Sequence, residues 1–156
     1  MSLLDTVLLI CEVKGWRFQV WYRISSLDNK TSRTAPLAEG LMKIGLPAHF
    51  GFSRTMGLLL QRGALVNEMG ADGSTALHRA ARAGHVTTIR VLLDNRATMN
   101  AKKNLWGTTP LHEAAIGHQH SALLLLCRLG AELEAKNFSR ETPLHVSARG
   151  GHVKVM

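Results

Sequence analysis

The chain has 156 residues, 46% hydrophobic and 19% charged, a balance that excludes an intrinsically disordered protein and favours one folded domain or one stacked array. Two cysteines are too few for a disulfide scaffold and indicate a reducing compartment, so we expect a cytoplasmic or nuclear protein. The net charge of +8 favours acidic partners. No apolar run reaches the ~20 residues of a membrane-spanning helix.

Residues 1–40 carry no repeated pattern and form a separate N-terminal segment that we expect to be poorly ordered. Residues 3–11 have the spacing of a short amphipathic helix. Residues 16–24 alternate apolar and polar side chains. This alternation is typical of a half-buried strand, and an exposed aromatic binding segment is the alternative. Residues 25–38 are polar and rich in turn formers, which indicates a linker.

The sequence after this segment repeats with a period of 33 to 34 residues. The marker tetrapeptide is Thr-Ala-Leu-His at 75–78 and Thr-Pro-Leu-His at 109–112 and 142–145. Each threonine stands where a helix N-cap is expected, with its hydroxyl free to accept an amide hydrogen bond. Pro110 and Pro143 then take the first helical position, where a missing N–H costs nothing.

Each repeat predicts two helices. The first helices are expected to open a buried stripe at Leu77, Leu111 and Leu144, and to end at glycines with positive φ, Gly84 and Gly151. The second helices are expected around residues 85–95 and 119–129. Cys127 follows an apolar run there, and we expect it to be a buried filler rather than an activated thiolate.

At these residues the chain resembles the ankyrin repeat family, whose unit carries T-P-L-H-x-A near its start. The resemblance implies an all-α solenoid of stacked helix-turn-helix units with short turn or β-hairpin tips. It extends over about residues 41–156. The expected units are a degenerate repeat 41–72, repeats 73–106 and 107–139, and a truncated repeat 140–156. Because this last repeat stops early, we expect a fragment or an isoform of a longer array.

Several positions depart from the repeat. Pro47 falls in the expected middle of a first helix and should break it. Arg96 stands where other units have glycine, a position that we expect to be left-handed. A residue other than glycine there should lower the stability of the fold by about 1 kcal/mol. His118 takes the place of another glycine, so that turn is expected to be shortened or shifted. Residues 101–107 carry one extra residue, which lengthens one loop.

The residue types for catalysis and metal binding are present, but their pattern does not favour either. Five of the eight histidines belong to the repeat motifs, and His112, His118 and His120 form the one local cluster without further ligands at zinc spacing. No glycine-rich phosphate loop or nucleophile motif occurs. We therefore expect no enzyme activity, no metal and no cofactor.

The resemblance implies that the protein is an interaction module, a scaffold or an adaptor. Such a module would bind an acidic or amphipathic segment of a partner protein through its loop tips and first-helix face. We expect a monomer. The implied site residues are Met69, Arg79, Arg82, Lys102, Lys103, Leu105, Trp106, Glu113, Lys136, Phe138 and Arg140.

Two alternatives stay open. The basic array, with +6 of the charge in residues 51–156, could bind nucleic acid or an anionic lipid surface, although its arginines are scattered over both helices. Trp106 could pack onto the neighbouring loop instead of contacting a partner, because exposed aromatic residues are unusual in loops.

Overall fold

The structure is a computed structural model that describes residues 44–61, 63–103 and 105–151. Backbone contacts separate residues 1–39 from residues 40–156, and the described residues all belong to the second unit. The predicted N-terminal segment therefore lies outside the described residues, as do residues 41–43 of the predicted degenerate repeat and 152–156 of the truncated one. Within the described ranges the chain forms helices and no strands.

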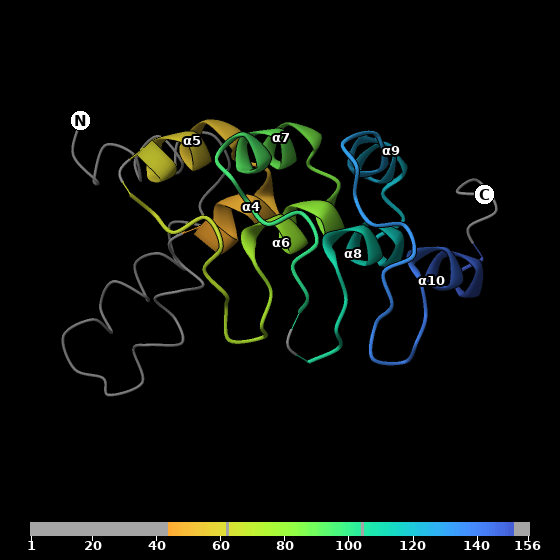
Figure 1. The fold of residues 1–156 in the computed structure, drawn as a ribbon. Coiled ribbons are helices and arrows are strands. Elements are labelled where there is room, and N and C mark those ends of the chain that lie inside the picture. Colours follow the sequence, from red (N-terminus) through yellow and green to blue (C-terminus); the bar gives the residue numbers. More distant parts are fainter. Residues whose placement is uncertain (1–43, 62, 104, 152–156) are drawn as a thin grey trace, which may run out of the picture. The chain divides into compact units, whose positions relative to one another are not determined.

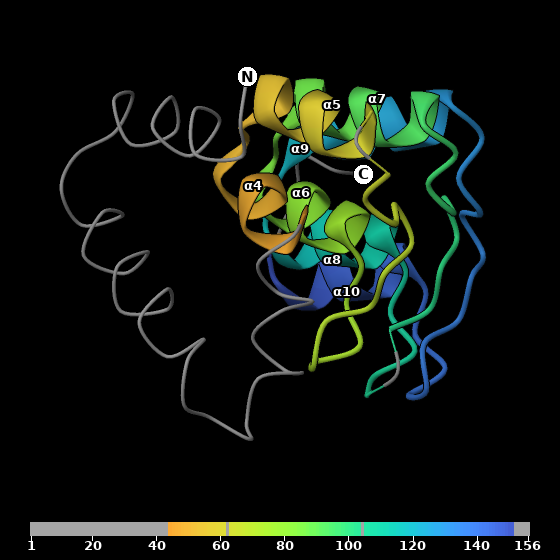
Figure 2. The same ribbon diagram turned by 90° about the vertical axis from the view of Figure 1, so that its left-hand side faces the viewer.

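The helices form pairs that stack along the chain (Figure 1). They are α4 (Leu46–Phe50) with α5 (Ser53–Gln61), α6 (Ala76–Ala83) with α7 (Val86–Asp94), α8 (Pro110–Ile116) with α9 (His120–Arg128), and then α10 (Pro143–Arg149). The first helix of each pair contacts the first helix of the next, and α7 contacts both α5 and α9. Two layers result, with the loops that precede α6, α8 and α10 extending away from the second helices (Figures 1 and 2).

The predicted helix starts are confirmed. Thr75, Thr109 and Thr142 are the N-caps of α6, α8 and α10, and a proline follows the last two. Each threonine forms a capping box with the histidine three residues later, a position that Glu or Gln more often occupies. The repeated tetrapeptide is therefore a helix-initiation signal.

Small residues allow the layers to approach closely. Ala80, Ala81, Ala114 and Ala115 are fully buried where α6 packs against α4 and α8. The larger core side chains come from both layers and include Leu77, Leu111, Ile89, Leu92, Leu125 and Leu126. Each pair alone has too little apolar surface for a core, so stacking supplies it.

Two expectations about burial are wrong. Leu144 is 52% exposed, whereas its counterparts Leu77 and Leu111 are buried. Cys127 is exposed, whereas its counterpart Leu93 is half-buried against the core. The reason is the same in both cases: in the inner units the next helix pair covers these positions. Among the described residues no helix pair follows α10.

Pro47 is the second residue of α4, and α-helical geometry begins just before it, after the π-helical residues Ile44 and Gly45. In the first turn a proline leaves the helix that follows intact, so residues 46–50 show no break; residues 41–43 lie outside the described residues. The helix ends at Phe50, and Gly51 follows with a φ of 75°.

The predicted left-handed residue is confirmed at Arg96, which has a φ of 66°. His118 has a φ of 59°, so this turn keeps its phase, and the predicted shortening or shift is wrong. Gly117 has an ordinary helical conformation, and its need for glycine is steric. A Cβ at this position would collide with the backbone carbonyl of Arg82 in the preceding unit.

Hydrogen bonds between successive units repeat along the stack. Nε2 of His78 lies 3.0 Å from the carbonyl oxygen of Thr108, and Nε2 of His112 lies 3.0 Å from that of Glu141. These two bonds fasten each first helix to the loop that leads into the next one.

A second series of bonds joins the loops that follow the second helices. Oδ1 of Asn67 accepts the backbone N–H of Thr98 at 2.7 Å. One unit later, Oδ1 of Asn100 accepts the N–H of Glu132 at 3.1 Å. The two asparagines therefore form the same junction at two consecutive interfaces.

Candidate functional site

Three loops carry most of the site residues implied by the sequence. We call them tip 1 (69–74), tip 2 (102–108) and tip 3 (136–141). One backbone hydrogen bond closes each: Gly70 N to Ser74 O, Lys103 N to Thr108 O, and Asn137 N to Glu141 O. Tip 2 encloses one residue more than the other two, which confirms the predicted longer loop. The tips point in the same direction (Figures 1 and 2).

Tips 2 and 3 are joined directly. The backbone N–H of Phe138 donates to the carbonyl of Trp106 at 3.0 Å, and Nζ of Lys102 donates to the carbonyl of Lys136 at 3.3 Å. The ring of Phe138 also lies over Gly107, where a Cβ would meet it closely. The two loops therefore form one continuous surface rather than two independent ones.

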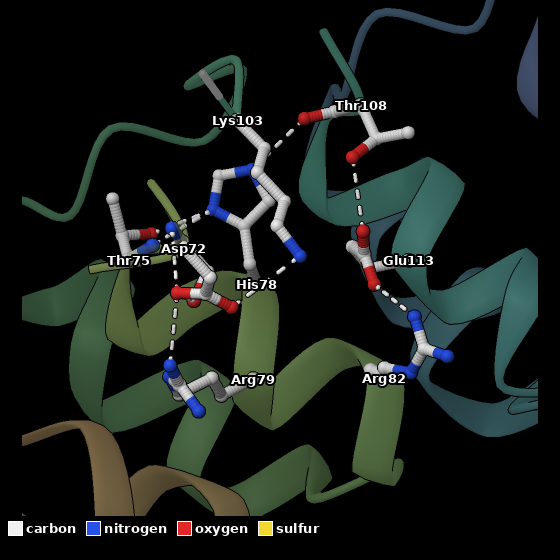
Figure 3. Close-up of polar contacts among 9 residues, drawn as sticks. Asp72, Thr75, His78, Arg79, Arg82, Lys103, Thr108 and Glu113 are labelled. Atoms are coloured by element: carbon white, nitrogen blue, oxygen red, sulfur yellow. Dashed lines mark hydrogen bonds and ion pairs between the residues drawn. The ribbon is translucent and has the colours of Figure 1, made fainter. Parts of the chain in front are cut away.

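Tip 1 and tip 2 are linked through a carboxylate (Figure 3). Asp72 lies 2.9 Å from Nη2 of Arg79 and 3.4 Å from Nζ of Lys103, and it accepts hydrogen bonds from Ser74. Partial burial would raise the pKa of Asp72, but the bonds from Ser74 and the two cations lower it to about 2. Asp72 is therefore ionised at neutral pH and holds Arg79 and Lys103 in internal contacts.

Large apolar side chains on the tips face solvent. Trp106 is 65% exposed and Phe138 is 67% exposed. Leu105 and Met69 are also exposed. With most of its surface open, Trp106 is not a packing residue between tips, the alternative left open by the sequence. Phe138 uses part of its ring for packing against Gly107.

The first-helix face differs from expectation at Glu113. We expected an exposed residue, but Glu113 is buried, because Thr108 donates to Oε1 at 2.9 Å and Arg82 of the preceding unit donates to Oε2 at 2.9 Å (Figure 3). Its carboxylate thus connects α6, α8 and tip 2. In this structure Glu113 supports the surface from beneath and offers no area to a partner.

The arginines of the first-helix face and the exposed cations of tips 2 and 3 differ in their partners. The arginines of the first-helix face are paired with carboxylates: Arg79 with Asp72, Arg82 with Glu113, and Arg149 with Glu141. The exposed cations of tips 2 and 3 form no ion pair with any described residue: Lys102, Lys136 and Arg140. Unbalanced positive charge therefore lies beside the exposed aromatic side chains.

Arg140 has a feature that we did not predict. Its φ is 60°, a left-handed conformation that two glycines adopt at the same place in tips 1 and 2, Gly73 and Gly107. The signal was present in the sequence, because Arg140 aligns with both glycines when the Thr-Pro-Leu-His motifs are superposed. A non-glycine residue in this conformation is strained.

The buried histidines are structural. The backbone N–H of Thr75 donates to Nδ1 of His78, which fixes Nδ1 as the unprotonated nitrogen and leaves Nε2–H to donate to Thr108. His112 has the same arrangement. Burial lowers the pKa of both histidines, so they are neutral near pH 7.

The described residues hold no cluster of three or more His, Cys, Asp or Glu side chains suited to a metal ion. Cys127 is exposed, but the partial desolvation of its thiol raises the pKa, the opposite of what an activated nucleophile requires. None of the helices in the described part of the chain has the length and apolar character needed to span a bilayer.

Comparison with known proteins agrees with the repeat pattern. The family model described as ankyrin repeats (3 copies) matches residues 46–137. The matched range includes tips 1 and 2 and the first part of tip 3. A search of the curated proteins finds no match.

Proposed function

This chain belongs to the ankyrin repeat family, whose repeats are generally protein–protein interaction modules, and we propose that it is a scaffold or adaptor that binds a partner through tips 2 and 3. The exposed part of the first-helix face adjoins these tips and completes the proposed surface. One observation carries the proposal: Trp106 and Phe138 are both exposed on loops that are hydrogen-bonded to each other.

The physical argument concerns anchor residues. Trp and Arg are enriched among the residues that dominate binding energy, and large side chains on a rigid support lose little entropy on association. The bonds between the tips provide such a support. Trp106, Phe138 and Arg140 are then the main anchors, with Leu105 and Met69 at the margin.

The paired arginines of the first-helix face weigh against nucleic-acid binding through that face, whereas the unpaired Lys102, Lys136 and Arg140 of the tips do not. A protein that binds phosphates needs cations free to replace counterions. Arg79, Arg82 and Arg149 are each already held by a carboxylate. We therefore treat nucleic acid or an anionic surface as an outcome of the test.

The test is affinity capture from cell lysate with the full chain as bait. A Trp106→Ala/Phe138→Ala bait removes the proposed anchors. A Leu65→Ala/Leu124→Ala bait is the matched control, because both leucines are exposed and lie outside the tips. Each bait is run with and without nuclease and at two salt concentrations.

We expect discrete proteins that survive nuclease and higher salt, are lost from the anchor variant and are kept by the control. Capture that vanishes with nuclease or salt and ignores the anchor variant would replace this function with charge-driven binding of nucleic acid. Loss of the captured proteins with both the anchor bait and the control bait would show that the tips are not the binding site.

A further inference from the structure

The unpaired cations of tips 2 and 3 indicate which chemical class of partner these tips bind. This inference rests on the proposed function. We infer that these tips recognise a short protein segment in which an acidic side chain stands next to a large apolar one. Lys136 and Arg140 would take the carboxylate, and Trp106 and Phe138 the apolar side chain. The two groups share one surface because Phe138 lies between Lys136 and Arg140 in tip 3 and is bonded to Trp106 in tip 2.

The first step is the distribution of acids. Asp72 and Glu141 are the carboxylates of the tips, and both are already engaged, by Arg79 with Lys103 and by Arg149. The exposed Glu132 and Glu134 precede tip 3 and form no ion pair with a described cation. Lys136 and Arg140 are therefore left without an internal counter-charge.

The second step is the position of Lys102. Its Nζ reaches across to the carbonyl of Lys136, so a third cation lies against tip 3 without adding a negative group. Three positive charges on two joined loops attract an anion. A carboxylate from outside balances this charge, and a further cation or a purely apolar segment does not.

The third step is the strain at Arg140. The two other tips place glycine in the same left-handed conformation, and arginine there costs stability that glycine would not. Backbone strain of this kind gathers at functional sites, because the side chain serves a purpose that the fold alone does not require. Arg140 makes no ion pair with any described residue, and unlike Arg96 it lies on a tip beside Phe138, so its charge is available to a partner at the proposed surface.

Trp106 and Phe138 specify the other half of the segment. Both rings are exposed, and the backbones of their residues are hydrogen-bonded to each other, so apolar surface lies on the same two loops as the unpaired cations. A purely acidic segment would leave this apolar surface in water. A segment with both residue types covers it and neutralises the charge.

The test is selection of peptides from a displayed library of random, unphosphorylated 12-residue peptides, with the immobilised full chain as bait. We expect enrichment of Asp or Glu within a few positions of Leu, Ile, Phe or Trp. Binding of the enriched peptides should weaken about tenfold or more in Lys136→Gln/Arg140→Gly, the loss typical of removing charge-assisted hydrogen bonds.

The matched control is Arg90→Gln/Arg128→Gln, which removes the same charge from the exposed surfaces of α7 and α9. It should leave peptide binding unchanged. Circular dichroism and thermal unfolding confirm that each variant is folded, and Arg140→Gly also relieves strain.

Three results would overturn the inference. Apolar peptides without acidic residues, lost with Trp106→Ala/Phe138→Ala, would refute the partner chemistry and leave the proposed function in place. Equal weakening by the control variant would show that diffuse charge attracts the peptides. Absence of any enriched peptide would refute a short-segment partner, and lysate capture would then still test the proposed function separately.

Discussion

Replacement of Arg96 by glycine isolates the free energy of a strained backbone position. The loops after α5, α7 and α9 make the same pair of closing hydrogen bonds, Gly63 N to Leu60 O with Ala64 N to Leu59 O in the first unit and their counterparts in the others. This is the Schellman arrangement, which requires a left-handed residue. Gly63 and Gly130 supply it with φ of 90° and 89°, and Arg96 with 66°.

The expected magnitude follows from two opposing effects. A left-handed conformation costs a residue with a Cβ about 1–2 kcal/mol. Opposing this, glycine lowers the free energy of unfolding by about 0.4–1 kcal/mol, because an unfolded chain with glycine has more conformations to lose on folding. The Arg96 side chain is exposed and forms no ion pair with a described residue, so its removal adds little. Arg96→Gly should therefore stabilise the fold by about 0.5–1 kcal/mol.

Urea unfolding followed by circular dichroism measures this difference, and thermal unfolding should show a rise of about 2–6 °C for an array of roughly one hundred residues. The reverse substitution, Gly130→Arg, provides the control. No atom lies within 4 Å of a Cβ built at Gly130, so only backbone strain changes there. Gly130→Arg should lower the free energy of unfolding by a similar or larger amount. The φ of 89° at this position lies further from the left-handed φ of about 57° that residues with a Cβ adopt.

The combination Arg96→Gly/Gly130→Arg should unfold close to the wild type, because the two changes exchange one strained position for another. If Arg96→Gly lowers stability while Gly130→Arg leaves it unchanged, left-handed strain does not govern these turns. A changed urea slope would instead show an effect on the unfolded state.

Three further measurements test the packing and the buried polar groups. Ser147→Ala should raise the free energy of unfolding by about 1 kcal/mol in urea, because its buried Oγ has no hydrogen-bond partner among the described residues; a lower stability would show that the hydroxyl is bonded. The pKa values of His78 and His112 are lowered by burial in the folded state, so the unfolded chain binds more protons below about pH 6.5. The contribution of these histidines to stability should therefore be complete well above that pH and be lost as the pH falls below it, and a flat profile of melting temperature against pH would contradict this. Leu92→Ala should cost about 2–5 kcal/mol through the cavity it leaves, while the exposed Leu124→Ala should cost less than about 1; equal costs would refute the burial assigned to Leu92.

Sequence reasoning recovered the helices because their signals are local and recur. Thr75, Thr109 and Thr142 each start a helix within one tetrapeptide. The same N-capping rule therefore predicts three helix starts. The same holds for Arg96, whose conformation follows from glycines at the equivalent places. Arg140 obeys the same logic, and a complete superposition of the repeats would have identified it.

Burial was less accessible to sequence reasoning, because it depends on what the neighbouring unit supplies. Glu113 is buried by Thr108 and by Arg82 from the unit before it, a pairing that the spacing along one helix does not reveal. Leu144 repeats the motif of Leu77 and Leu111 but is exposed, because its environment is set by the next element in the stack. Local patterns therefore predict where helices lie, and contacts between units decide which side chains remain available.

The bonds that fasten one unit to the next have a consequence for motion. Asn67, Asn100, His78 and His112 each reach into the following unit, so a helix pair is held mainly by its immediate neighbours. Local unfolding should then involve one helix pair at a time, because this exposes less surface than unfolding of the whole stack. Amide hydrogens of α6, which has a neighbour on each side, should exchange with solvent more slowly than those of α10. Tips 2 and 3 lead into the neighbouring helices α8 and α10, so a partner bound across both tips would hold these two layers together.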